Sequence, residues 1–382
     1  MTDSPDNRWF TLARQPQEPL SQGGATLVGA DLAEWRRRFR PLLRYLARRE
    51  TVLALSGGGM AMSAHASILR VLELLGVSPT RIYGTSAGAV IGGFRAAGMS
   101  TADIEAALLD IRSADALFGF ASRYPALRLV AGAIIRTFVR PSMKEAGIYD
   151  LDRVEGHIED ILTRYVGGVP TMGELELPFY CVAVDIGTGA SVSGAADPVR
   201  KVVFSREATP DVRLSDAIGA SMSIPGVITP KRLGGRYYID GAALEHLPVL
   251  AAYNDWTRRR KRFPRSRLAI VASDLGYAGE TLPERELADP IDLVVHSRRL
   301  QERAITYYNL LMCHRPRRRC SVIMVRPGGI RIELHEVTKM RACLHSAYEG
   351  TVEQLSGRDF LRETNASIER AGSFLGLPGA SG

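Results

Sequence analysis

A serine inside a glycine-rich segment is the first candidate for chemistry in this 382-residue chain. Ser86 lies in Gly84-Thr85-Ser86-Ala87-Gly88, between an apolar segment expected to be a strand and a helix predicted over residues 87–97. A sharp strand-to-helix turn requires small neighbours, because bulkier Cβ atoms would collide. The G-x-S-x-G spacing therefore predicts a nucleophile elbow that exposes the Ser86 hydroxyl. An ordinary glycine-rich turn before a helix is the alternative.

Three consecutive glycines form a second candidate site. Gly57, Gly58 and Gly59 follow a strand predicted over residues 52–55 and precede a helix predicted over 64–75. Such glycines let the backbone turn its N–H groups toward an anion. An oxyanion hole for acyl transfer, a flexible connection and a phosphate-binding loop are all open interpretations. The G-x-x-x-x-G-K-[ST] and G-x-G-x-x-G patterns are both missing, which disfavours a nucleotide site.

An acidic residue completes the set. Asp240, followed by Gly241, ends a strand predicted over residues 236–240. A serine hydroxyl is a poor nucleophile until a base takes its proton, and a carboxylate within hydrogen-bond reach can do this. Ser86 and Asp240 are far apart in the sequence, so only the tertiary fold can bring them together.

The glycine loop, the G-x-S-x-G segment and the Asp-Gly pair, in this order, resemble the patatin-like phospholipase family. The resemblance covers roughly residues 50–350 and includes the small-residue segment 220–226. It implies a three-layer α/β/α fold with a mainly parallel central sheet, and catalysis by a Ser–Asp dyad without histidine or metal. The residues to which it assigns roles are Ser86 as nucleophile, Asp240 as base, and Gly57, Gly58 and Gly59 as oxyanion hole.

Two positions near the loop qualify this interpretation. Many relatives carry Arg or Lys two residues after the third glycine, where this chain has Ala61. The loss of this cation affects the expected recognition of a phosphate head group and leaves the backbone N–H donors in place. His65 begins the next helix and suggests a Ser-His-Asp triad, but the resemblance implies that it is structural.

The composition is that of a folded, basic protein. Hydrophobic residues make up 46% of the chain and charged residues 24%, which disfavours disorder over most of its length. A net charge of +8 favours acidic partners such as anionic lipid. The four cysteines lack C-x-x-C spacing, so we expect free thiols and no zinc site. No cofactor is expected.

The N-terminus and the lengths of the apolar runs bear on where we expect the protein to work. The polar N-terminus has no signal-peptide pattern, and no apolar run is long enough to cross a bilayer. We therefore expect a cytoplasmic protein in peripheral contact with membranes; a non-classically secreted effector is the alternative.

Three regions are expected along the chain: an N-terminal lead with a basic amphipathic helix (1–50), the catalytic domain (51–350) and a helical tail (351–382). The helix predicted over residues 32–49 has an apolar stripe and an arginine-rich face. That face is either solvated or in contact with an anionic membrane surface. The basic run 258–262 is predicted to be a solvated loop, and without aromatic platforms it does not indicate nucleic-acid binding.

Other segments complete the expectations. Aromatic residues within 114–139 predict either an acyl-chain groove or a pair of cap helices, and 321–325 and 330–334 are predicted strands. The resulting hypothesis is a serine hydrolase that cleaves fatty-acyl esters of lipids. A catalytically silent lipid- or partner-binding module on the same scaffold, and an anion- or nucleotide-binding protein, are the alternatives.

Overall fold

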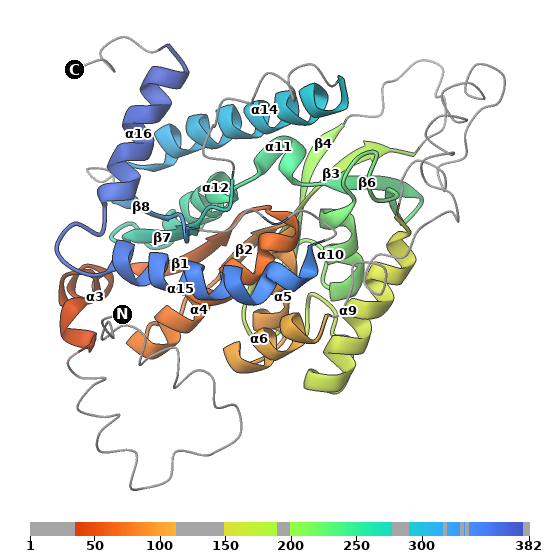
Figure 1. Ribbon diagram of the computed structural model, residues 1–382, viewed down its shortest axis with the longest axis horizontal. Coiled ribbons are helices and arrows are strands. Elements are labelled where there is room, and N and C mark those ends of the chain that lie inside the picture. Colours follow the sequence, from red (N-terminus) through yellow and green to blue (C-terminus); the bar gives the residue numbers. More distant parts are fainter. Residues whose placement is uncertain are drawn as a thin grey trace, which may run out of the picture.

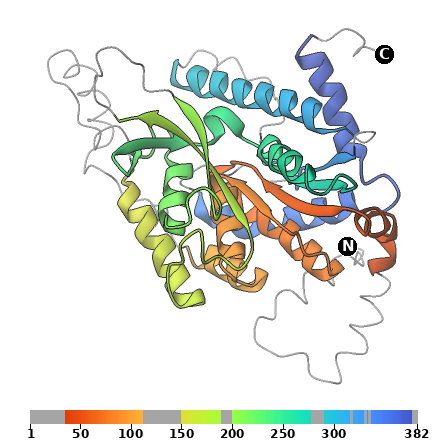
Figure 2. The same ribbon diagram turned by 180° about the vertical axis from the view of Figure 1, so that it is seen from behind.

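In the described part of the chain, a mixed sheet of eight strands forms the centre of the computed structural model (Figures 1 and 2). The structure describes residues 35–111, 149–188, 199–276, 290–315, 319–328, 332 and 336–376. Its strands are β1 (Glu50–Leu55), β2 (Ile82–Thr85), β3 (Phe179–Gly187), β4 (Arg200–Ser205), β5 (Lys231–Leu233), β6 (Arg236–Asp240), β7 (Leu268–Ser273) and β8 (Cys320–Val325). They are ordered β5-β6-β3-β2-β1-β7-β8, and β4 pairs with β3 outside this path.

The five strands β3, β2, β1, β7 and β8 are parallel to one another. Their sequences are nearly continuous apolar runs, as expected for strands covered on both faces. Alternate side chains enter two separate cores: Leu53 and Leu55 contribute to one, whereas Val52 and Ala54 contribute to the other. Because successive side chains of a strand point to opposite faces, each face of the sheet has its own hydrophobic core.

Helices cover both faces. On one side lie α3 (Arg40–Leu46), α4 (Ser63–Leu75), α5 (Ala87–Ala96), α6 (Thr101–Asp110), α9 (Leu151–Val166), α10 (Leu214–Met222) and α15 (Met340–Leu355). On the other lie α12 (Val249–Arg260) and α14 (Pro290–Cys313), with α16 (Arg362–Phe374) packed against α14 and β8. The predicted α/β fold with a mainly parallel central sheet is confirmed.

The N-terminal helix is interrupted and ends three residues earlier than predicted, at Leu46. Residues 35–38 are helical, Phe39 lies in a turn, and α3 then begins. Pro41 explains the break, because it has no N–H to donate to the carbonyl four residues earlier. Of the predicted apolar stripe, Trp35, Phe39, Leu42 and Leu46 are buried and Leu43 is half-buried. These side chains belong to the main core, and α15 runs across the predicted boundary at residue 350.

One predicted loop is partly helical. The first three arginines of the basic run, Arg258, Arg259 and Arg260, form the last turn of α12. A helix C-terminus favours cations, which explains why the helix continues through them. The whole segment 114–139 and, except for Ile332, the predicted strand 330–334 lie outside the described residues. Within the described part of the chain, none of the helices combines the length and apolarity needed to span a bilayer.

Candidate active site

The predicted nucleophile and base are brought together along one edge of β3. Thr85, the last residue of β2, pairs with Val182, and the next residue of β3, Ala183, pairs with Asp240 at the end of β6. The antiparallel strand β4 pairs with the same stretch of β3, so it occupies the opposite edge. The C-terminal ends of β2 and β6 therefore face each other along this edge of β3. Ser86 follows β2 and Asp240 ends β6, so both residues lie at this junction.

The turn at Ser86 has the strained geometry of a nucleophile elbow. Ser86 has a φ of 52° and a ψ of −117°, a conformation that L-residues rarely adopt. A Cβ on Gly88 would lie 2.2 Å from the carbonyl oxygen of Leu55, and one on Gly84 would lie 2.5 Å from that of Gly88. The small residues of G-x-S-x-G are therefore required by close backbone approach.

A second serine, whose role the sequence did not reveal, holds this turn. Ser221, on α10, accepts a hydrogen bond from the backbone N–H of Ser86 (2.8 Å) and donates one to the carbonyl of Val182 (2.6 Å). Its side chain is fully buried. The only signal in the sequence was its place in the small-residue segment 220–226. Ser221 thus ties the elbow to the strand that positions Asp240.

The Asp240 carboxyl is fully enclosed and contacts Ser86. Burial raises the pKa of Asp240, while the hydrogen bonds that its carboxylate accepts from the N–H of Ala242 (2.7 Å) and from Ser86 act in the opposite direction. A carboxylate with a raised pKa is a stronger base toward a hydroxyl than an exposed one. The arrangement can transfer a proton from Ser86 to Asp240.

The glycine loop lies beside the elbow, but its three amides are not equivalent. The N–H of Gly57 donates to the carbonyl of His246 (3.0 Å), so it is already used. The N–H groups of Gly58 and Gly59 have no acceptor among the described residues. Gly59 has a φ of 54°, which favours glycine at this position. The donors that remain for an oxyanion are therefore those of Gly58 and Gly59.

His65 stabilises the glycine loop through hydrogen bonds of its ring. Its Nε2 lies 2.9 Å from the carbonyl of Ser56, and its Nδ1 lies 2.9 Å from the hydroxyl of Ser273. Complete burial lowers the pKa of His65 to about 4, against a smaller opposing effect of the bond to Ser56. The ring is therefore neutral near pH 7: Nε2–H donates to Ser56, and Nδ1 accepts from Ser273. Both nitrogens are used in holding the loop.

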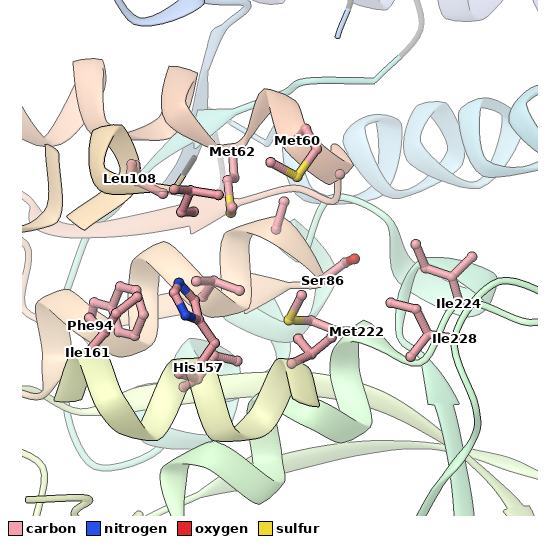
Figure 3. Close-up of a pocket in the computed structure, with 16 residues that line it drawn as sticks. Met60, Met62, Ser86, Phe94, Leu108, His157, Ile161, Met222, Ile224 and Ile228 are labelled. Carbon is pink, nitrogen blue, oxygen red and sulfur yellow. The ribbon is translucent and has the colours of Figure 1, made fainter. Parts of the chain in front are cut away.

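An apolar pocket opens from Ser86 (Figure 3). It is lined from α5, α6, α9 and α10 and by the short 3-10 helix η1 (Gly59–Met62). Its lining includes Met60, Met62, Phe94, Leu108 and Met222. The lining also includes His157, and burial lowers the pKa of its imidazole. The pocket offers a lipid tail an apolar surface next to the serine.

Within the described part of the chain, no three or more His, Cys, Asp or Glu side chains cluster in a way that could hold a metal ion. Cys181, Cys313, Cys320 and Cys343 are all buried and unpaired, as predicted.

An elbow serine, adjacent loop amides and a buried acid at the carboxyl end of a parallel sheet are typical of α/β serine hydrolases. The family model for patatin-like phospholipases matches residues 53–253, more than half of the chain. The chain belongs to the patatin-like phospholipase family. Members of this family are lipid acyl hydrolases.

Relatives and solved structures extend the comparison. An uncharacterised NTE family protein of Mycobacterium tuberculosis is 32% identical over 197 residues, covering 52% of this chain and 44% of that protein. The lysophospholipase NTE1 of Mycosarcoma maydis is 27% identical over 274 residues, covering 71% of this chain and 12% of that protein. The chain therefore spans less than half the length of either relative. The crystal structure of VipD from Legionella pneumophila aligns with a TM-score of 0.41 and 16% identity, over 81% of this chain and 66% of that one.

Proposed function

We propose that this protein is a serine lipid acyl hydrolase that cleaves fatty-acyl esters through a Ser86–Asp240 dyad. The observation that carries the proposal is the junction on β3, where adjacent positions pair with Thr85 and Asp240. Asp240 takes the hydroxyl proton, and Ser86 Oγ attacks the ester carbonyl. The carbonyl oxygen gains negative charge and is stabilised by the amides of Gly58 and Gly59; one such donor is typically worth ~10²–10³ in rate.

Collapse of the tetrahedral intermediate breaks the bond to the alcohol, which leaves with a proton from Asp240. The acyl group stays on Ser86 until water, deprotonated by Asp240, releases the fatty acid. The apolar pocket beside Ser86 supports a fatty-acyl substrate, because each buried CH₂ group contributes roughly 0.8 kcal/mol.

The preferred head group is a separate question. Ala61 replaces the loop cation of many relatives, so we propose that the enzyme discriminates weakly between phospholipids and neutral acylglycerols. Among the described residues, Arg298 on α14 lowers the pKa of Asp240 electrostatically, so it is a guanidinium that can compensate. Its Nε is paired with Glu302 (2.8 Å).

The decisive experiment compares wild type with Ser86→Ala on a panel of phospholipids, lysophospholipids and acylglycerols. We expect fatty-acid release by wild type only, and labelling by a fluorophosphonate that is lost in Ser86→Ala. Undiminished turnover by a folded Ser86→Ala protein would refute the assignment. A silent lipid-binding module instead predicts lipid binding with neither turnover nor labelling.

A further inference from the structure

The short helix α11 (Ala242–Glu245) lies between β3 and α14 and contacts two parts of the proposed site (Figure 1). Its first N–H, that of Ala242, donates to Asp240 Oδ1 (2.7 Å). Its last carbonyl, that of Glu245, accepts a hydrogen bond from the hydroxyl of Thr85 (3.0 Å), which ends β2 just before the elbow. The helix therefore touches both the proposed base and the strand that carries the proposed nucleophile.

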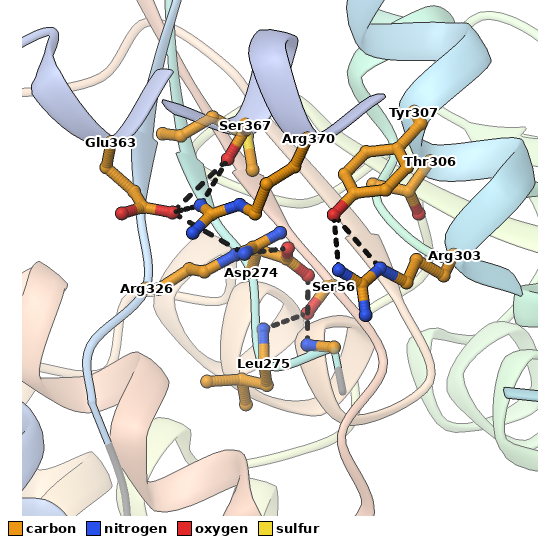
Figure 4. A network of polar contacts seen from close by, with 12 residues as sticks. Ser56, Asp274, Leu275, Arg303, Thr306, Tyr307, Arg326, Glu363, Ser367 and Arg370 are labelled. Carbon is orange, nitrogen blue, oxygen red and sulfur yellow. Dashed lines mark hydrogen bonds and ion pairs between the residues drawn. The ribbon is translucent and has the colours of Figure 1, made fainter. Parts of the chain in front are cut away.

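The glycine loop is also supported by this segment, through the residue that follows α11. The carbonyl of His246 accepts the Gly57 N–H (3.0 Å). The start of the loop has a separate support, because the Ser56 hydroxyl accepts the N–H of Leu275 (2.8 Å) within the polar network of Figure 4. Only the first of these two supports continues directly into α11, so a displacement of α11 would move the base, the elbow strand and the loop relative to one another.

A buried ion pair holds α11 in place. The Glu245 side chain is fully buried, and its Oε2 accepts a hydrogen bond from Nζ of Lys201 on β4 (2.5 Å). Its Oε1 accepts the N–H of Ala251 in the first turn of α12 (2.8 Å), where a helix N-terminus favours negative charge. Both carboxylate oxygens are used, and they tie α11 to β4 and to the start of α12.

The two partners of this pair differ in their access to water. The Lys201 side chain is 26% exposed, so its ammonium could turn to solvent if Glu245 lost its charge. Glu245 has no such access, and a carboxylate left buried without its partner is strongly destabilising. Loss of the lysine charge should therefore displace Glu245, and α11 with it, more than neutralisation of Glu245 itself.

We propose that Glu245 is a positioning residue of the active site. Its pair with Lys201 fixes α11, and α11 fixes Asp240, Ser86 and the glycine-loop amides relative to one another. A misplacement of about 1 Å can cost about a hundredfold in rate, so the pair acts on kcat without touching the substrate. This inference rests on the proposed function, because such positioning affects a rate only where those groups act together.

The first test is a double-mutant cycle in kcat and KM on a soluble activated ester, for Lys201→Met, Glu245→Gln and the double variant. We expect Lys201→Met to lower kcat about tenfold to a hundredfold, with KM little changed. Glu245→Gln should lower kcat less, and the double variant should return to the level of Glu245→Gln because it has no buried unpaired charge. A double variant no more active than Lys201→Met, or a Lys201→Met protein as active as wild type, would overturn the proposal.

Arg70→Met is the matched control. Arg70 of α4 pairs with Glu105 of α6 (2.8 Å), and the two side chains are 18% and 14% exposed. This pair lies on the opposite face of the sheet from α12 and α14, so its loss should lower the urea midpoint and leave kcat and KM unchanged. If Arg70→Met and Lys201→Met lose kcat in proportion to their loss of stability, general loosening explains both and the positioning role is wrong.

A second test does not depend on activity. Amide hydrogen exchange reports local opening, so Lys201→Met should exchange at Gly57 and within residues 242–247 at least about tenfold faster than wild type. In Arg70→Met, faster exchange should be confined to α4 and α6. Unchanged exchange at Gly57 in Lys201→Met would overturn the positioning role. Faster exchange there, together with no turnover by wild type, would instead overturn the proposed function and retain the support of the loop by α11.

Discussion

His65 gives a prediction whose size follows directly from the structure. Burial lowers the pKa of its imidazole to about 4, whereas an unfolded chain has the ordinary histidine value of about 6.5. Between these two pKa values, the imidazole is protonated in the unfolded chain and neutral in the folded protein. The contribution of neutral His65 to the free energy of unfolding is therefore fully present above about pH 6.5 and is lost as the pH falls toward 4. The loss is about 2 kcal/mol at pH 5 and about 3 kcal/mol at pH 4.

The assay is urea unfolding of wild type and His65→Gln between about pH 7 and pH 4, since other titrating groups cancel in the difference. The variant should be less stable at pH 7, because the bonds to Ser56 and Ser273 are disturbed. Its stability should then fall less steeply with acid than that of wild type, by about 2 kcal/mol at pH 5. Parallel loss of stability in the two proteins would refute the neutral, buried state of His65.

The same variant tests the mechanism. Removal of a general base typically costs about 10²–10⁴ in rate. Because both ring nitrogens of His65 are occupied in holding the loop, we expect folded His65→Gln to keep kcat within about tenfold of wild type. A loss of kcat as large as that of Asp240→Asn would replace the dyad with a histidine-dependent mechanism.

Asp240→Asn should lower kcat at least about a hundredfold without unfolding the protein, as measured by ester turnover and circular dichroism. Ser221→Ala leaves the Ser86 N–H and the Val182 carbonyl unpaired, so the free energy of unfolding should fall by about 1–3 kcal/mol and kcat should fall with it. Ala61→Arg should raise the ratio of kcat/KM for phosphatidylcholine to that for a matched diacylglycerol by about tenfold or more. If wild type already prefers the phospholipid by about a hundredfold and Arg298→Gln loses that preference, Arg298 supplies the cation. Binding to anionic vesicles should weaken with salt, because the arginines on α3 are exposed and the Debye length is about 8–10 Å; equal binding to neutral vesicles would contradict this.

Comparison with the sequence shows where local patterns are sufficient. The elbow could be predicted because Gly84 and Gly88 are required wherever backbone approaches within the reach of a Cβ. The strands could be predicted because a parallel strand buried on both faces is apolar at nearly every position, as β7 is. The Arg258–Arg260 turn was misplaced because arginine suits both a solvated loop and a helix end, and sequence alone does not decide between them.

The conclusions that depend on distant residues required the tertiary structure. Each of the residues Ser86, Asp240 and Gly58 stands in a recognisable local motif, but their proximity depends on which strand pairs with which edge of β3. The use of the Gly57 amide by His246, and the support of the elbow by Ser221, involve partners more than a hundred residues away. The elbow at Ser86 followed from local sequence, because the geometry of so tight a turn depends on neighbouring side chains. Which loop amides stay free and which acid meets the serine could be seen only in the folded chain, because those contacts depend on long-range pairing that no local pattern encodes.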